Sequence, residues 1–151
     1  MQPTAELFTE KAWAAILSAQ NQAQKRRHQQ LESEHLLLAL LEQDGLASRI
    51  LEKAGVTPSV LQTNLESYLN QQPALQSAPE SVYLGKGLNS LLDRSESLKQ
   101  EYGDSYISVE HLLLALAGDP RCGQRLLTQV GADAKALKTA IDAVRGSQTV
   151  T

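Results

Sequence analysis

Apolar residues recur along most of the chain at spacings of three and four, the pattern of α-helices that bury one face. In the first half, the predicted helices cover about residues 10–27, 33–43, 46–54 and 57–69. In the second half, they cover about residues 84–102, 108–117, 121–130 and 134–144. The segment 71–81 contains two prolines and no such periodicity, so we predict a linker there.

The two groups of four helices are copies of each other. The segment Glu-His-Leu-Leu-Leu-Ala-Leu at 34–40 recurs unchanged at 110–116, an offset of 76 residues. The same offset, without a gap, aligns Leu31 with Ile107 and Gly55 with Gly131. We therefore predict a tandem duplication. Its parts are repeat one (about 7–70), the linker (71–81), repeat two (about 82–146) and the start of a further linker (147–151).

The duplication raises the question of whether the two repeats form one domain or two. Four short helices of about 55 residues bury only a marginal core. The run Leu36–Leu41 is apolar on all sides, which predicts a central helix covered from several directions. The 26 Leu and 18 Ala outnumber the 11 Val and Ile, a bias toward helix. We predict an all-α fold, a single globular domain in which the two repeats are related by pseudo-two-fold symmetry.

Charge and composition narrow the classes of function. A net charge of −3 argues against a nucleic-acid partner, and we interpret the basic cluster at 25–28 as a solvated helix end. No apolar run reaches the roughly 20 residues that span a bilayer, so we expect no membrane contact. The N-terminus lacks the pattern of a secretory signal. The single cysteine, Cys122, cannot form an internal disulfide, which suits a reducing compartment.

None of the candidate chemical motifs predicts a catalytic reaction. The segment 118–123 has the glycine spacing of a P-loop but lacks the following Lys and Ser/Thr, so we interpret it as a turn. The pairs Glu34-His35 and Glu110-His111 are adjacent residues that point about 100° apart on a helix and cannot chelate together. We interpret the pairs as capping and packing residues, with Glu34 and Glu110 as acids that the helix dipole favours in the first turn. Cys122 has no base nearby in the sequence and is interpreted as a small, semi-buried hydrophobe. We predict no catalytic residue, metal site or cofactor in this chain.

The duplicated heptapeptide, with Gly103–Val109 before its second copy, resembles the N-terminal domain of the Clp-type AAA+ unfoldases. The resemblance covers residues 7–146 and is strongest to the ClpB disaggregase branch. Each repeat ends in a related motif, at 51–55 and 127–131. The sequence departs from the family at Arg27-His28, where Gly-His is usual, and this departure predicts a differently shaped turn in repeat one.

The resemblance implies a role in binding. The whole protein would be a cytoplasmic, hexameric heat-shock ATPase that threads aggregated polypeptides, with its ATPase modules beyond this chain. This domain would be monomeric in isolation and non-enzymatic. Its partners would be unfolded or aggregated proteins and the downstream AAA+ modules of its own chain. The alternative is an adaptor-docking domain of a protease-coupled relative. The sequence after Thr151 would distinguish the two.

The resemblance also implies a binding site. A hydrophobic groove would use the helix that contains Leu91, Leu92 and Leu98. Arg94 and His111 stand where other members can carry apolar residues, which predicts a more polar groove. Three polar positions, Thr9, Asp104 and Glu110, match ones that the family associates with function. Their alternative interpretation is structural: Thr9 caps the first helix, and the two acids order the turn of repeat two.

Overall fold

A computed structural model describes residues 1–146 and 148–151. Repeat one contains α1 (Glu10–Lys25), α2 (Ser33–Glu42), α3 (Leu46–Lys53) and α4 (Pro58–Asn70). Repeat two contains α5 (Lys86–Glu101), α6 (Val109–Leu116), α7 (Gly123–Gln129) and α8 (Ala134–Arg145). The predicted pattern of eight helices is confirmed. The structure adds a 3₁₀ helix (Ala5–Leu7) and two short strands, β1 (Gln30–Leu31) and β2 (Tyr83–Leu84). The segment 147–151, predicted as a linker start, includes residue 147, which lies outside the described residues.

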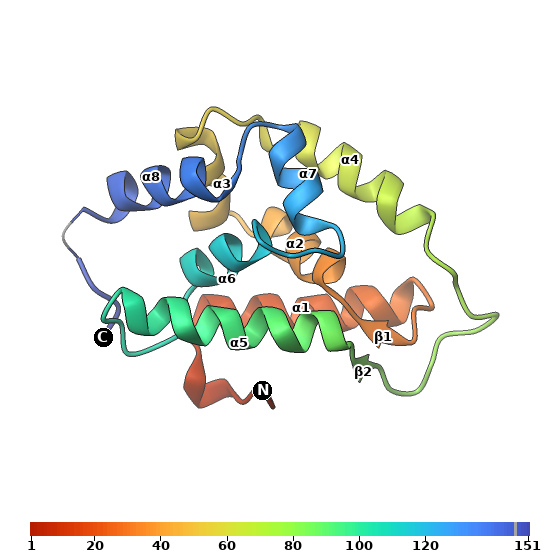
Figure 1. Cartoon of the computed structure of the whole chain (residues 1–151). Helices are drawn as coiled ribbons and strands as arrows, with labels where there is room; N and C mark the ends of the chain where they lie inside the picture. The colour runs from red at the N-terminus through yellow and green to blue at the C-terminus, as the bar shows by residue number, and fades with distance from the viewer. Residues whose placement is uncertain (147) are drawn as a thin grey trace.

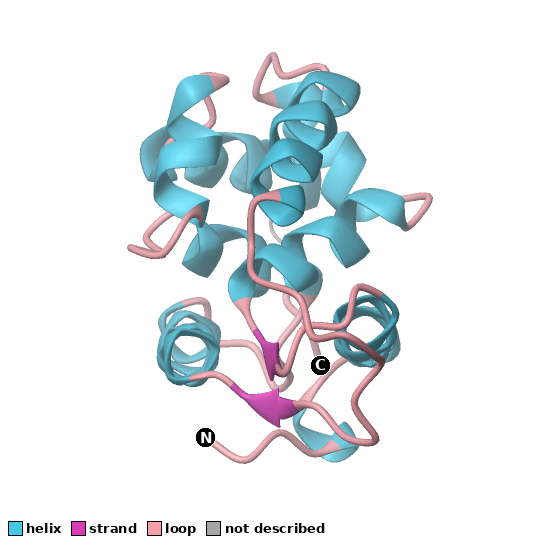
Figure 2. Ribbon diagram, turned by 90° about the vertical axis from the view of Figure 1, so that its right-hand side faces the viewer, coloured by secondary structure: helices cyan, strands magenta, loops and turns pink. Residues whose placement is uncertain are grey.

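The helices form two layers. Helices α1 and α5 lie in the lower part of Figure 1, and the other α-helices lie above them. In Figure 2, α1 and α5 are seen end-on at either side of the two strands. Helices α2 and α6 contain the repeated heptapeptide, and all eight residues of α6 are buried. In α2 the residues from Ser33 to Leu41 are buried. These two helices are therefore central, as their all-apolar sequences predicted.

The segment before the first helix of each repeat pairs with the other repeat. Strands β1 and β2 are parallel, with Leu31 opposite Leu84, and an isolated parallel bridge joins Phe8 to Ile107. At the offset of 76 residues, Phe8 corresponds to Leu84 and Leu31 to Ile107, so the two contacts are symmetry equivalents. The segment that enters α1 thus pairs with repeat two, and the segment that enters α5 pairs with repeat one.

The upper helices also cross between repeats. Helix α3 packs against α8, and α4 packs against α7, which is the equivalent contact under the pseudo-two-fold relation. One cluster of buried apolar side chains runs through both halves. Because each repeat completes the packing of the other, the two repeats form a single domain.

The turn after α1 has the same shape as the turn after α5. Arg27 has a φ of 64° and Gly103, its equivalent, a φ of 70°. Both turns are closed by the same backbone bonds, from His28 N to Ala23 O at 2.9 Å and from Asp104 N to Lys99 O at 3.0 Å. The prediction of a differently shaped turn is wrong. The backbone bonds hold the turn, and the arginine adopts a left-handed conformation that glycine accepts more easily.

The helix starts show how a symmetric backbone accommodates different side chains. Thr9 caps α1, with its hydroxyl accepting from Ala12 N at 3.2 Å, as predicted. The equivalent residue before α5 is Gly85, where a Cβ atom would lie 2.2 Å from Oε1 of Glu32. Ser108 is the equivalent of Glu32 and is shorter. The long glutamate of repeat one therefore lies against the glycine of repeat two, and the equivalent pair is the serine of repeat two and the threonine of repeat one.

No helix within the described ranges is both long and apolar enough to cross a membrane.

Candidate functional site

The repeated histidines cap the central helices. Nδ1 of His35 accepts a hydrogen bond from the backbone N–H of Glu32 at 3.0 Å. Nδ1 of His111 accepts from the N–H of Ser108 at 2.8 Å. Each histidine thus reaches back over the first turn of its helix and satisfies an otherwise unpaired backbone donor. The prediction that these pairs cap the helices is confirmed for the histidines, and in each neutral ring the proton is on Nε2.

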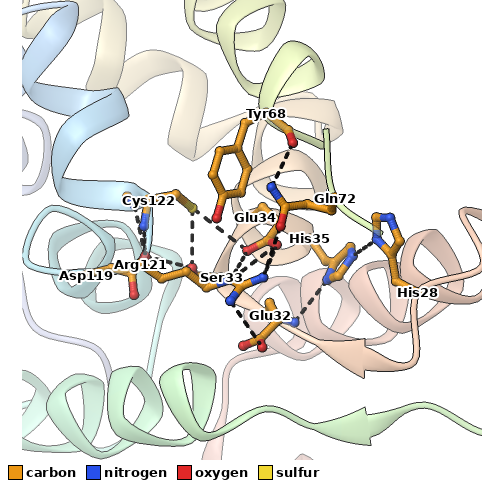
Figure 3. Close-up of polar contacts among 11 residues, drawn as sticks. His28, Glu32, Ser33, Glu34, His35, Tyr68, Gln72, Asp119, Arg121 and Cys122 are labelled. Carbon is orange, nitrogen blue, oxygen red and sulfur yellow. Dashed lines mark hydrogen bonds and ion pairs between the residues drawn. The ribbon is translucent and has the colours of Figure 1, made fainter. Parts of the chain in front are cut away.

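The two capping histidines donate to different partners. Nε2 of His35 lies 2.8 Å from Nδ1 of His28, and Nε2 of His111 lies 2.7 Å from Oδ2 of Asp104. His28 and Asp104 are equivalent positions of the duplication. Burial lowers the pKa of His28, and it lowers the pKa of His35 to about 3, with His28 contributing. Repeat one therefore holds a neutral histidine pair (Figure 3), whereas repeat two holds an acid–histidine pair.

Asp104 ties together the end of repeat two. Nη2 of Arg145 lies 2.8 and 3.0 Å from its two oxygens, and the backbone N–H of Val150 donates to Oδ1 at 2.7 Å. Burial alone would raise the pKa of Asp104, but the bonds from Val150, Arg145 and His111 hold it below its ordinary value. Nε of Arg145 also lies 3.5 Å from Glu110. Asp104 and Glu110 thus brace the turn before α6 and the end of α8.

A second buried polar cluster joins the repeats around Arg121 (Figure 3). Nε and Nη2 of Arg121 lie 2.9 and 3.0 Å from the two oxygens of Glu34, and Nη1 lies 3.6 Å from Glu32. Sequence reasoning missed this ion pair, because Arg121 and Glu34 lie 87 residues apart and no local spacing connects them.

Asp119 and Cys122 complete this cluster. Oδ2 of Asp119 accepts from Ser33 Oγ at 2.7 Å, Cys122 N at 3.0 Å and Gly123 N at 2.8 Å. Asp119 therefore holds the start of α7 and links it to α2. Burial raises the pKa of the Cys122 thiol to about 12, so the thiol stays protonated. Its interpretation as a small hydrophobe is confirmed, but the side chain is fully buried in the core, 1% exposed, where a semi-buried one was predicted.

A groove of about 740 Å³ opens in repeat two between α5, the end of α6 and the start of α8. Leu91 and Leu98 of α5 and Leu114 of α6 form its apolar floor and are only 4%, 5% and 9% exposed, and Arg94 stands at its rim. The full lining comprises Gly87, Ser90, Leu91, Arg94, Leu98, Glu101, Tyr102, Leu114, Ala115, Gly118, Asp119, Pro120, Ala134, Lys135 and Lys138.

The structure brings three of the five predicted groove residues together. Leu91, Arg94 and Leu98 line the groove, whereas Leu92 and His111 do not. Leu92 is 1% exposed, because the next residue on a helix points about 100° away from Leu91 and here meets the core. His111 is 0% exposed and faces Asp104. These two placements correct the sequence-based set.

The corresponding surface of repeat one is bridged by polar side chains. Leu98 corresponds to Gln22, whose Nε2 donates to Glu42 at 3.0 Å. Gln43, the equivalent of Asp119, donates to the carbonyl of Lys11 at 2.9 Å. These bonds tie α1 to the end of α2 where repeat two leaves space. A comparison of the two repeats position by position could have found the groove, since Leu98 is apolar where Gln22 is polar.

The described part of the chain contains no group of three or more His, Cys, Asp or Glu side chains that could hold a metal ion. The groove offers apolar contact and charged side chains at its rim. It is therefore suited to binding a ligand.

Known proteins resemble this chain over its whole length. The family model for the Clp repeat (R) N-terminal domain matches residues 7–130. The chain is 60% identical over 151 residues to chaperone protein ClpB 1 of Parasynechococcus marenigrum, covering 100% of this chain and 18% of that protein. It is 51% identical over 145 residues to chaperone protein ClpB of Gloeobacter violaceus, covering 95% of this chain and 17% of that protein.

The fold also matches a solved structure. The Hsp104 N-terminal domain from Candida albicans superposes with a TM-score of 0.83 at 23% identity, covering 95% of this chain and 94% of that chain. At this identity the likeness shows the fold alone. The chain spans less than a fifth of the length of the curated relatives it matches.

Proposed function

The chain belongs to the Clp repeat N-terminal domain family and is similar to the N-terminal part of ClpB chaperones, and from this premise we propose that it engages non-native polypeptides for a disaggregase motor. The observation that carries the proposal is the apolar groove in repeat two. Unfolded and aggregated proteins expose apolar side chains that a native surface hides, so such a groove distinguishes them from native proteins.

The size of the groove supports this role. A volume of about 740 Å³ lies within the usual range for ligand pockets, roughly 300–1,000 Å³. It accommodates a few apolar side chains of an extended segment. Contact with so small a surface yields little beyond the entropic cost of association, so binding is weak. Weak binding suits a domain that must release its substrate to the next module.

The polar clusters support a role in binding without catalysis. In both capping histidines, Nδ1 accepts a hydrogen bond from a backbone N–H group and so is not free to act as a base. The thiol of Cys122 is buried and protonated. ATP hydrolysis and threading would then belong to AAA+ modules elsewhere in a hexameric, cytoplasmic protein. Substrate would be captured here and passed to those modules.

An NMR titration tests the proposal. The isotope-labelled domain is titrated with an unfolded model protein and, as the control, with the same protein in its native fold. We expect shifts that cluster at Leu91, Leu98 and Leu114 with the unfolded form only. The variant Leu98→Gln introduces the residue that stands at the equivalent site, Gln22, and should weaken binding. Shifts outside the groove, or shifts with a folded partner instead, would favour the adaptor-docking alternative.

A further inference from the structure

The groove carries positive charge at its edges, and this observation extends the proposed function, on which it rests. We propose that the groove prefers apolar segments that carry aspartate or glutamate beside their apolar anchors. The inference concerns which non-native segments bind. It follows from the charged residues that line the groove and from their absence at the equivalent positions of repeat one.

Three cations line the groove from two helices. Arg94 belongs to α5, and Lys135 and Lys138 belong to the first turns of α8. The side chains of Arg94 and Lys138 are 57% and 58% exposed, and Lys135 is also exposed. Lys138 is held over the ring of Tyr102, another lining residue, at 4.7 Å from the ring centroid. A segment that lies against Leu91 and Leu98 therefore passes between cations from both helices.

Two carboxylates of the lining, Glu101 and Asp119, offset part of this charge, so the lining keeps one more cation than acids. Glu101 lies 3.7 Å from Arg94, and Asp142 lies 3.4 Å from Lys138. Both are exposed pairs of the kind that contributes little and that a ligand carboxylate can replace. Asp119, the remaining acid of the lining, has its Oδ2 bonded to three donors from this chain, and its Oδ1 is buried without a hydrogen-bond partner. Lys135 has no ion pair with any residue that the structure describes.

The duplication provides an internal comparison. The residues equivalent to the three cations in repeat one are Ser18, Ser59 and Gln62, all neutral. There, polar bonds of Gln22 and Gln43 bridge the surface that corresponds to the groove. The positive charges therefore occur in the repeat that has the groove, in a chain whose net charge is −3.

The apolar and charged surfaces have separate effects on binding. Leu91, Leu98 and Leu114 supply contact with apolar anchors, whereas exposed cations mainly add specificity and raise the rate of association. Charges act over about 10 Å at 0.1 M ionic strength, so acidic residues next to the anchor lie within reach. Lysine or arginine at the same positions of the segment is repelled.

Fluorescence anisotropy with matched peptides tests the inference. Three labelled peptides share one apolar core and carry flanking pairs of Asp, Gln or Lys. A fourth peptide carries the Asp flanks around a Gly-Ser core. We expect the Asp-flanked apolar peptide to bind about five-fold more tightly than the Lys-flanked one, the effect of two or three exposed charge contacts. Added salt should reduce this difference.

Two double variants locate the effect. Arg94→Gln/Lys135→Gln removes two cations of the groove, and Lys25→Gln/Arg49→Gln removes two exposed cations from α1 and α3. We expect the first variant to lose the preference for acidic flanks while it still binds the Gln-flanked apolar peptide. The second variant should keep the preference.

Each outcome decides the inference. Equal binding of the three apolar peptides overturns the inference and leaves the proposed function standing. Equally tight binding of the Gly-Ser peptide shows attraction by charge alone and overturns the inference as well. The same follows if the preference disappears only in Lys25→Gln/Arg49→Gln. Failure of every peptide to bind overturns both the inference and the proposed function.

Discussion

Arg121 and Glu34 form a two-point ion pair between the repeats, with Nε 2.9 Å from Oε1 and Nη2 3.0 Å from Oε2. Glu34 is only 1% exposed, in a cluster that also contains the carboxylates of Glu32 and Asp119. The arginine therefore neutralises negative charge that the fold places in its interior. Both residues stand at the start of elements that meet across the pseudo-two-fold axis.

Loss of the arginine should strongly destabilise the domain. We expect Arg121→Gln to lower the free energy of unfolding by about 2–3 kcal/mol, since it leaves the buried carboxylate of Glu34 without its cation. This value is below the range for fully buried pairs, because Arg121 is partly exposed. Urea unfolding followed by circular dichroism measures the change. Arg125→Gln in α7, the helix that follows Arg121, is the matched control and should change stability by less than about 1 kcal/mol. Equal effects of the two variants would contradict the assigned role.

The left-handed turns predict opposite effects of two substitutions. Arg27→Gly should stabilise the domain by about 0.5–1 kcal/mol. It removes the cost of a left-handed conformation at arginine, and this gain exceeds the stability lost because glycine makes the unfolded chain more flexible. Gly103→Arg should destabilise it by about 1–2 kcal/mol. A Cβ atom at Gly103 meets nothing within 4 Å, so the conformation alone accounts for that effect. Thermal melts of both variants provide the measurement. A lower midpoint for Arg27→Gly would show that its side-chain contacts outweigh the strain.

The buried histidine pair predicts a loss of stability in mild acid. The folded-state pKa values of His28 and His35 lie below the ordinary 6.5, so the unfolded chain binds protons that the folded chain does not. The domain therefore keeps its full stability, as far as these two groups are concerned, above pH 6.5, and it loses stability as the pH falls below that value. Each histidine contributes a slope of at most about 1.4 kcal/mol per pH unit.

The variant His28→Asn separates this pair from other groups, because its side-chain oxygen can still accept from Nε2 of His35. Urea unfolding at about pH 7 and about pH 5.5 brackets the histidines and stays above the ordinary pKa of carboxyl groups. We expect a smaller loss of stability in the variant than in the unaltered chain. An unchanged loss would assign the pH dependence to other groups.

The central helices predict one cooperative transition. Leu37 and Leu113 are equivalent and fully buried, so Leu37→Ala and Leu113→Ala should each lower the free energy of unfolding by about 2–5 kcal/mol. Because the helices pack across the repeats, each substitution should shift the melting of the whole domain. Calorimetry is the test, with Leu17→Ala on the exposed face of α1 as the control. Two separate transitions, only one of which moves, would show that the repeats unfold independently.

The sequence by itself determined the helices, the duplication and the start of the first helix at Thr9. These features depend on contacts within about one turn of helix, so a short stretch of sequence contains all the interacting groups. The capping role of His35 and His111 was predictable for the same reason, since each bonds three residues back.

Only the tertiary structure decided how the two copies pair and where the groove lies. Two copies with the same apolar pattern can pack within or across repeats. The parallel pairings that include Phe8 with Ile107 and Leu31 with Leu84 involve too few residues to produce a strand pattern in the sequence. Leu91 and Leu92 are both leucines on one helix, and the orientation of α5 against α6 selects the one that faces the groove. Arg121 meets Glu34 only because α7 and α2, far apart in the sequence, are brought together by burial of apolar surface from both repeats.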